Sequence, residues 1–264
     1  MWRVLRIVVL LLLLLTLAVS TWRTKARTTA WKETLQAVVY PMNADNSAAS
    51  SAYIAQLKED DFDDMQDFFA TETARYGLKN IRPLDVHLAP ELTSLPPPRP
   101  ETQSALAAMQ WSLQLRWWAW QHDKWQGGRP DIRLFVLYHD PATHTRLDHS
   151  TGLDKGQMAV IKAFASKQYG RTNQVIISHE LLHTLGATDK YDPQTLEPRY
   201  PQGYADPQAN PRYPQHWAEI MGGRIPMSET SSAIPVNLQR TLIGAQTAQE
   251  IGLTAAVAKN TRPN

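Results

Sequence analysis

The segment at about residues 172–185 constrains this chain most, because it places the pattern His-Glu-x-x-His within an apolar stretch. Residues four apart on an α-helix differ by about 40° around the axis and about 6 Å along it. His179 and His183 would therefore share one helix face and offer two ring nitrogens to one metal ion. Glu180 would lie beside that metal, where it can deprotonate a bound water. The pattern predicts a buried helix with a catalytic zinc site and Glu180 as general base.

The residues after this helix predict a third ligand. A catalytic zinc takes three protein ligands and keeps one position for water. Gly186 favours the left-handed conformation that ends a helix, and a chain reversal there would return Asp189 towards the two histidines. Because Thr188-Asp189-Lys190 is also ordinary turn chemistry, a plain turn residue is the competing interpretation of Asp189.

The whole string, His-Glu-x-x-His-x-x-Gly-x-x-Asp over residues 179–189, resembles the metzincin clan of zinc metallopeptidases. The resemblance is to the version with Asp as third ligand that is found in snapalysin-like enzymes. Metzincins also carry a methionine in a tight turn beneath the metal, and Met221, followed by two glycines, is similar to such a Met-turn. The resemblance covers roughly residues 130–227. It implies Zn²⁺ as cofactor, held by the two histidines and Asp189, and a peptide or protein substrate.

Other residues compete for the third ligand position. The usual third ligand in metzincins is His, and Asp is the minority choice. Glu219 is an alternative, because other zincins take a Glu from a later helix, and Asp192 is another. His216 lies near Glu219 in sequence and could reach the metal. Met221 is equally well interpreted as ordinary core packing.

The resemblance also implies the fold, an α/β (α+β) domain of the metzincin-like zincin type. Such a domain has a twisted mixed sheet with an edge strand over the active-site helix, two long backing helices and an irregular C-terminal subdomain, here about 187–264. The residues at about 158–165 would form that edge strand and bind extended peptide by strand addition.

The residue pattern itself predicts the same succession of elements. A proline-rich loop at 89–101 separates the early elements from the later ones, and its five prolines favour extended chain. We expect strands at 35–40, 84–88, 132–138 and 157–165, and helices at 51–76, 101–125 and 236–255.

The first residues predict export or a membrane anchor. Residues 7–20 are uncharged and include six consecutive leucines, with basic residues on both sides. The 16 residues of Ile7–Trp22 fall slightly short of the roughly 17–25 that span a bilayer, and Ala18-Val19-Ser20 fits a signal-peptidase site. We predict a single-pass signal anchor in 1–28 and an extracytoplasmic catalytic domain in 29–264, periplasmic or extracellular, or secreted if the anchor is cleaved.

Charge and cysteine content exclude several classes of function. Residues 1–27 hold five basic and no acidic residues, so the remaining 22 basic and 25 acidic residues give a net charge of −3. This balance offers no basic surface for nucleic acid. The absence of cysteine excludes disulfides, thiol nucleophiles and Cys-ligated zinc.

Two further groups of residues are weaker candidates for a role in a site. Three histidines, with aspartates between them, could form a second metal site, although loops often carry such residues without one: His139, His144 and His149. Tyrosines in the proline-rich stretch after Asp189 could stabilise an oxyanion or simply rigidify the loop: Tyr191, Tyr200, Tyr204 and Tyr213.

The sequence thus predicts a zinc-dependent metallopeptidase that cleaves peptide bonds with Glu180 as general base. One alternative is a non-catalytic binding or scaffold protein at the membrane on a zincin fold, with the tryptophan-rich helix at 101–125 as a working surface. Another is a zinc hydrolase of non-peptide amides, since the same chemistry applies to both substrates.

Overall fold

A five-stranded sheet forms the centre of the molecule, in the order β2-β1-β3-β5-β4. A computed structural model of the chain describes residues 2, 6, 15, 19, 25–100, 104–147, 151–153 and 157–253. All neighbouring strands are parallel except β4, which runs antiparallel to β5. The strands are β1 (Leu35–Asn43), β2 (Leu84–Leu88), β3 (Ile132–His139), β4 (Thr151–Leu153) and β5 (Met158–Phe164). The predicted mixed α/β class is therefore confirmed.

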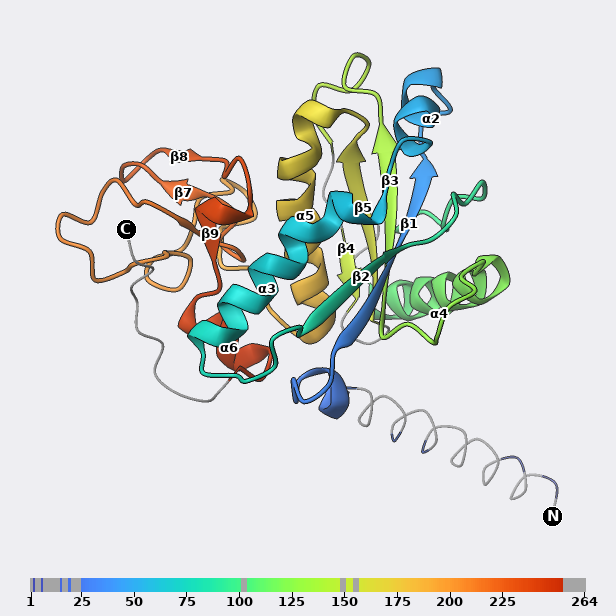
Figure 1. Cartoon of the computed structure of the whole chain (residues 1–264), viewed down its shortest axis with the longest axis horizontal. Helices are drawn as coiled ribbons and strands as arrows, with labels where there is room; N and C mark the ends of the chain where they lie inside the picture. The colour runs from blue at the N-terminus through green and yellow to red at the C-terminus, as the bar shows by residue number, and fades with distance from the viewer. Residues whose placement is uncertain are drawn as a thin grey trace.

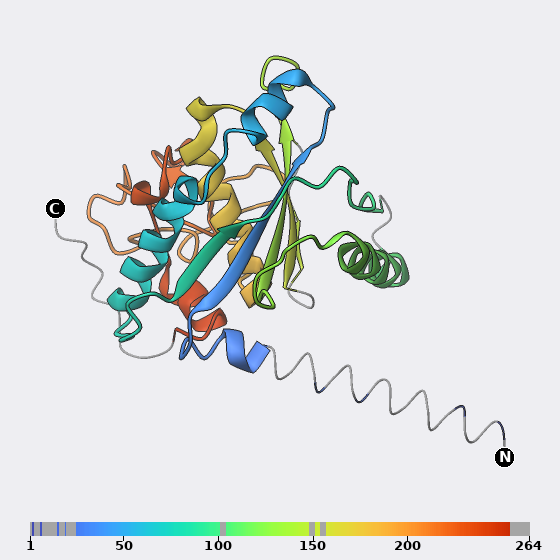
Figure 2. The same ribbon diagram turned by 45° about the vertical axis from the view of Figure 1, so that its right-hand side comes forward.

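Helices cover both faces of this sheet (Figure 1). One face carries α3 and α5, and the other carries α4, which stands alone there (Figure 2). The central strands are buried on both faces, and β1 and β3 accordingly read as nearly continuous apolar runs. The helices are α2 (Ala48–Ile54), α3 (Asp63–Arg75), α4 (Ala105–His122), α5 (Gly170–Leu185) and α6 (Ala245–Glu250).

The chain after α5 is irregular and packs against that helix (Figure 1). Its described residues, up to 253, contain two pairs of two-residue strands and one short α-helix, α6. The strand β6 (Ala218–Glu219) pairs with β9 (Thr241–Leu242), and β7 (Ile225–Pro226) pairs with β8 (Ser232–Ala233). Ile220, Met221 and Ile243 from this region join the same core as Leu181 and Leu182 of α5.

The predicted edge strand is wrong in position. Residues 158–164 form β5, which lies inside the sheet between β3 and β4. The edge is the three-residue strand β4, which the sequence analysis did not identify. A segment of three residues is too short to show the alternation on which strand prediction depends.

Two predicted helices are also wrong in extent. The helix expected at 51–76 is divided into α2 and α3 by a short 3-10 turn, because the Asp61 carboxylate accepts the backbone N–H of Lys58 at 2.8 Å and so competes with continuous helix. The helix expected at 236–255 is mostly absent. Asn237 caps a 3-10 turn there, and only α6 is helical within the described part of that segment.

The prediction of a membrane anchor is not supported. Among the residues that the structure describes, no helix has the length and apolar character needed to cross a membrane. This finding contradicts the predicted single-pass anchor and the location inferred from it. Of the predicted segment 1–28, residues 1, 3–5, 7–14, 16–18 and 20–24 lie outside the described residues.

Candidate metal centre

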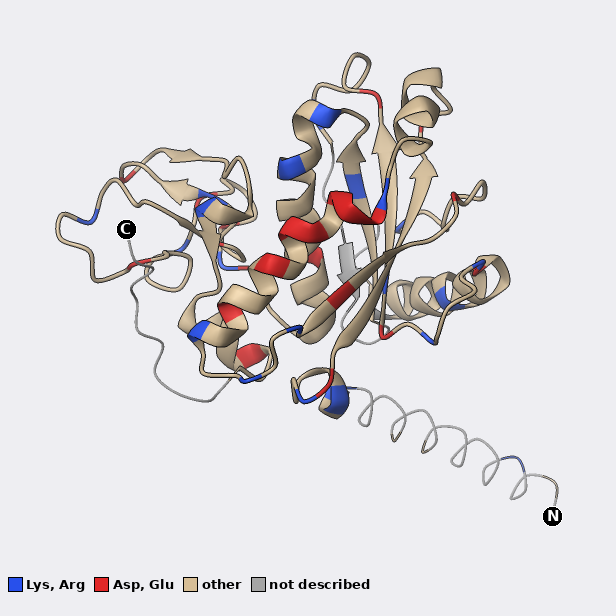
Figure 3. Ribbon diagram, viewed as in Figure 1, with Lys and Arg blue, Asp and Glu red and all other residues tan. Residues whose placement is uncertain are grey.

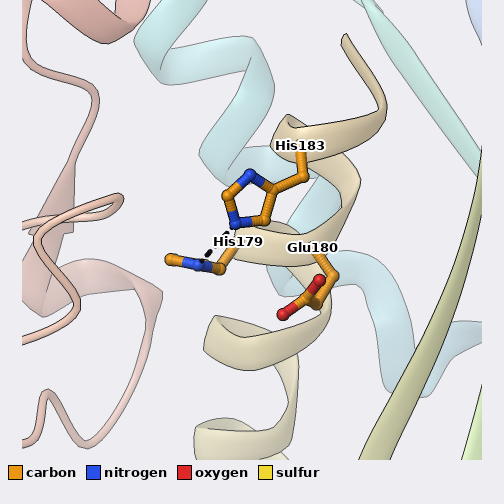
Figure 4. A group of neighbouring side chains, drawn as sticks. All are labelled: His179, Glu180 and His183. Atoms are coloured by element: carbon orange, nitrogen blue, oxygen red, sulfur yellow. Dashed lines mark hydrogen bonds between the residues drawn. The ribbon is translucent and has the colours of Figure 1, made fainter. Parts of the chain in front are cut away.

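The helix α5 brings two histidine rings together on one face (Figure 4). The ring centroids of His179 and His183 are 4.8 Å apart, and their Nε2 atoms are 3.1 Å apart. The opposite faces of α5 are buried through Ile177, Leu181 and Leu182 in the main core. Packing on those faces holds the helix in place, so the position of both rings is fixed by the core.

Hydrogen bonds to backbone carbonyls determine which nitrogen of each ring is available. His179 Nδ1 donates to the Ile220 carbonyl oxygen at 2.9 Å, and His183 Nδ1 donates to the Ala187 carbonyl oxygen at 2.8 Å. Because a carbonyl oxygen can only accept, Nδ1 must carry the hydrogen in both rings. In the neutral rings each Nε2 is then a lone-pair donor, as in metal-binding histidines.

A glycine turn brings the third oxygen to these nitrogens. Gly186 ends α5 with φ of 106°, in the region that favours glycine, and Ala187 N donates back to the Leu182 carbonyl oxygen. The chain then reverses and places Asp189 Oδ1 3.1 Å from His179 Nε2 and 3.1 Å from His183 Nε2. One atom from each of the three side chains therefore forms a triangle with equal sides.

The turn that carries Asp189 is fastened to α6 by a cluster of polar contacts. Glu250 accepts hydrogen bonds from the backbone N–H and the hydroxyl of Thr188, at 2.8 and 2.9 Å. The Lys190 ammonium, whose side chain is only 4% exposed, lies 2.7 Å from Glu250. These contacts flank Asp189 on both sides in sequence and fix the backbone from which its carboxylate projects.

The charges at the triangle stabilise one another. Burial lowers the pKa of His179, but its hydrogen bond to Asp189 and the charges of Glu180 and Asp189 outweigh burial and raise that pKa to about 9. Burial also opposes ionisation of Asp189, yet hydrogen bonds from His179 and His183 hold its pKa well below the usual value. The site therefore favours an anionic oxygen and a positive charge between the three atoms.

The triangle fits a zinc ion. Zinc bonds to nitrogen and carboxylate oxygen are about 2.0–2.2 Å long, so tetrahedral zinc ligands lie roughly 3.3 Å apart. The observed separations of 3.1 Å are close to this value. The donor set of two neutral imidazoles and one carboxylate is among those that zinc prefers.

Glu180 lies next to this triangle rather than within it. Its side chain is almost buried, with 6% of the residue exposed. One carboxylate oxygen and the ligand nitrogens of the two histidines all lie within 4.8 Å of one another (Figure 4). This position is suitable for a base that acts on a molecule bound to the metal.

The alternative ligands occupy other positions. Glu219 is fully buried, and its carboxylate accepts hydrogen bonds from Gly222 N, Gly244 N and the Thr247 hydroxyl at 2.7–3.0 Å. Burial raises the pKa of Glu219 above its usual value, and these donors offset only part of that effect. Asp192 instead caps its own loop by accepting the N–H groups of Gln194 and Thr195.

Met221 lies in a tight turn that also contacts the candidate metal centre. The N–H groups of Gly222 and Gly223 donate to the Glu219 carbonyl oxygen at 2.9 and 3.0 Å, and Gly223 has φ of 72°. The Met221 side chain is fully buried in the main core. Its carbonyl oxygen accepts the Lys190 N–H, and the preceding carbonyl orients His179. The turn therefore contacts the triangle and the residue after Asp189 through its backbone.

The weaker histidine candidates are not brought to the triangle by any described contact. The rings of His139 and His144 are 5.1 Å apart, and His144 lies 3.7 Å from Asp45. The third member of that group, His149, is outside the described residues. His216 makes a ring contact with Trp217. In the described part of the chain, the only group of at least three His, Asp or Glu residues close enough together to hold a metal ion is that at His179, Glu180 and His183.

Among the tyrosines that the sequence singled out, Tyr191 has a ring contact with a histidine of the site. Its ring centroid lies 6.3 Å from that of His179. Burial raises the pKa of its hydroxyl, and the negative charges of Asp189 and Glu180 raise it further. The hydroxyl is therefore neutral at ordinary pH and can donate a hydrogen bond.

Lys190 and Glu250 belong to the site without any sequence pattern that would predict it. They are 60 residues apart in the chain, and neither belongs to a motif. No local signal could have paired them, because only the folded chain brings α6 to the turn after α5. The same is true of the Ile220 carbonyl oxygen, because any residue at that position would supply it.

No family model matches this chain, and no curated protein matches it.

Proposed function

We propose that this protein is a zinc-dependent peptidase whose metal is held by His179, His183 and Asp189. The observation that carries the proposal is the triangle of two Nε2 atoms and one carboxylate oxygen, each 3.1 Å from the others. When both rings are neutral, the three lone pairs that meet at this distance repel one another unless a cation lies between them. The two Nδ1 hydrogen bonds supply the orientation that metal-binding histidines require.

The residues around the triangle have distinct roles in the proposed reaction. When bound, zinc would lower the pKa of a water molecule and polarise the substrate carbonyl. Glu180 accepts the proton from that water as the water oxygen attacks the carbonyl carbon. The same carboxyl group then gives the proton to the leaving nitrogen as the C–N bond breaks. Glu180 is almost completely buried beside the triangle, so its carboxylate is held next to a molecule bound there.

Tyr191 has the position and protonation state of an electrophilic partner in this reaction. Its neutral hydroxyl can donate to the carbonyl oxygen of the substrate as negative charge develops on that atom. The same carboxylates that raise its pKa, Asp189 and Glu180, define the site on which the substrate would lie.

The sheet supports the choice of an extended peptide as substrate and a metzincin-like arrangement. The strand β4 forms the edge, is antiparallel to its neighbour, and contacts α5. In the part of the chain that the structure describes, its second edge pairs with no strand. An extended peptide could add to that edge through backbone hydrogen bonds and pass the metal.

Zinc content and chelator sensitivity test this proposal. We expect about one zinc per chain by elemental analysis, and casein cleavage that a chelator stops and added Zn²⁺ restores. Glu180→Gln should retain zinc but lower the cleavage rate by about 10²–10⁴-fold. Glu229→Gln, at an exposed position in the C-terminal region, is the matched control and should cleave normally.

Two outcomes would reject the proposal. Full activity of Glu180→Gln would exclude Glu180 as the general base. A protein that never binds zinc would exclude a role for the metal. Bound zinc without cleavage of casein or any peptide library would favour one of the alternatives, a binding protein or a hydrolase of non-peptide amides.

A further inference from the structure

The helix α4 has apolar side chains on two opposite sides. Its inner side packs on the sheet, where Trp111, Leu115 and Trp118 join a second core with Tyr40 and Phe135. Trp118 meets Phe135 edge to face, with ring centroids 5.0 Å apart. This contact accounts for the inner apolar residues and leaves the outer ones unexplained.

The outer side of α4 is a continuous exposed stripe, which we call the outer stripe. Its members are each 56–72% exposed: Leu106, Met109, Leu113, Trp117 and Trp120. The rings of Trp117 and Trp120 contact each other, with centroids 5.1 Å apart. The helix α4 is the only described helix on its face of the sheet (Figure 2), and the exposure of these side chains places them on its solvent side. Large apolar residues that gather in this way on one surface typically mark an interaction site.

The spacing of the outer stripe is symmetric about its central residue. Leu106 and Trp120 lie seven residues before and after Leu113, and Met109 and Trp117 lie four residues before and after it. A helix that pairs with its own copy in antiparallel orientation needs this symmetry, since a twofold axis at the centre exchanges the two ends. Separations of three and four residues also give the seam of a packed helix pair.

We propose that the outer stripe binds a second copy of this chain, with α4 antiparallel to its counterpart and the twofold axis at Leu113. In this arrangement each tryptophan lies beside a smaller residue of the other copy. Trp120 lies beside Leu106, and Trp117 lies beside Met109, whose sulfur makes favourable contacts with aromatic rings. Large residues thus meet smaller ones at both ends of the seam.

The size of the stripe is sufficient for this pairing. Five large side chains that are more than half exposed present on the order of 500 Å² per copy. Two copies would bury roughly 1,000 Å² in total, which reaches the lower range of specific interfaces. Further contacts around the helix pair would add to this area.

The charges on α4 favour a protein partner over a lipid bilayer. Arg116 is its only charged side chain, and α4 is otherwise uncharged in Figure 3. Helices that lie on bilayers usually have several Lys or Arg residues on a polar face, whereas the other face of α4 is buried on the sheet. Gln110 and Arg116 flank Leu113 three residues to either side and supply a polar rim.

Single cysteines test the geometry directly, because the natural chain has none. Leu113→Cys in the full-length protein should form a disulfide-linked dimer on mild oxidation, since the two sulfurs would meet at the axis. Leu106→Cys alone should not, because the two positions would be about 21 Å apart along the seam. A mixture of Leu106→Cys and Trp120→Cys should form the mixed dimer.

Sedimentation measures the strength of the same contact. Trp117→Lys should raise the dimer Kd by about 30-fold or more, as expected for an interface hot spot. Gln114→Lys, on the same helix but outside the stripe, is the matched control and should change the Kd little. Circular dichroism checks that both exposed variants remain folded.

Three results would overturn the proposal. Self-linking of Leu106→Cys would show a parallel pair. If the protein were a monomer at all concentrations and Leu113→Cys formed no disulfide-linked dimer, a second copy of the chain would be excluded as the partner. A monomer that binds phosphatidylglycerol vesicles, and loses this binding in Trp117→Lys, would make a bilayer the occupant of the stripe.

Discussion

The helix α5 and the irregular chain after it contribute to the candidate metal centre in different ways. The helix supplies two histidines and Glu180 through spacing alone, and its position is fixed by the core. The irregular region supplies Asp189, the two carbonyl oxygens that orient the histidines, and the contacts between Lys190 and Glu250. One half of the site is therefore local in sequence, and the other half depends on contacts between distant segments.

The residues that the sequence motif supplies therefore differ in origin from the residues that complete and position the site. Residues of the helix can be recognised without knowledge of the fold, but they present only two ligands. The irregular region converts these two ligands into a closed triangle. Substitutions in the helix and in the irregular region should consequently have different effects on zinc binding and on stability.

Replacement of Asp189 should have the largest effect on metal binding. Asp189→Asn keeps the size of the side chain but removes the charge that faces both Nε2 atoms. We expect the zinc Kd to rise by at least 100-fold, beyond the 10–100-fold that is typical of residues that only orient ligands. Competition with a chromophoric chelator measures this change.

Asp192→Asn is the matched control for that variant. Asp192 follows three residues later and caps its own loop, so its replacement should leave zinc affinity unchanged. If Asp192→Asn lost zinc and Asp189→Asn retained it, the assignment of the third ligand would be reversed.

The pH dependence of zinc binding should reveal the coupling of helix and loop. In the metal-free site the pKa of His179 is raised to about 9, chiefly by Asp189 against the effect of burial. Below that pH one proton must leave before Nε2 can bind zinc, so affinity should rise by about tenfold per pH unit between pH 6 and 8. Asp189→Asn should flatten this rise near pH 8, because its loss lowers the pKa of His179. An affinity that is independent of pH in the natural protein would contradict the coupling.

Much of the regular fold could be predicted from the sequence. The strands at 35–40, 84–88 and 132–138 are confirmed almost to their ends, because they are buried and rich in β-branched and aromatic residues. The short edge strand β4 carries no such pattern. The break between α2 and α3 depends on the Asp61 side chain competing for Lys58 N, which helix periodicity does not reveal.

The candidate site could be predicted only in part, for the same reason. His179, Glu180 and His183 follow from helix geometry, and Gly186 signals the turn. The close approach of Asp189 depends on the direction that the chain takes after Gly186. The buried position of Glu219 shows the limit: its sequence context suggested a ligand, whereas three donors from the C-terminal region surround it.

Glu219 should therefore affect stability more than metal binding. Glu219→Ala would remove the acceptor of the Gly244 N–H and of the buried Thr247 hydroxyl, at a cost of about 3 kcal/mol in the free energy of unfolding. Chemical denaturation measures this loss. Zinc stoichiometry at low temperature, where the variant remains folded, should still be about one per chain. Loss of zinc from a folded Glu219→Ala protein would restore Glu219 as a ligand.

Glu250 offers the most selective test of how the irregular region supports the site. Glu250→Gln keeps an acceptor for Thr188 but removes the charge beside the buried Lys190 ammonium. The turn should loosen without losing Asp189, so we expect the zinc Kd to rise by about tenfold, as for other residues that orient ligands. Glu229→Gln, exposed in the same region, should leave the Kd unchanged. A Kd for Glu250→Gln equal to that of the natural protein would show that Gly186 and the helix alone position Asp189. The distant half of the site would then consist only of the two carbonyl oxygens that orient the histidines.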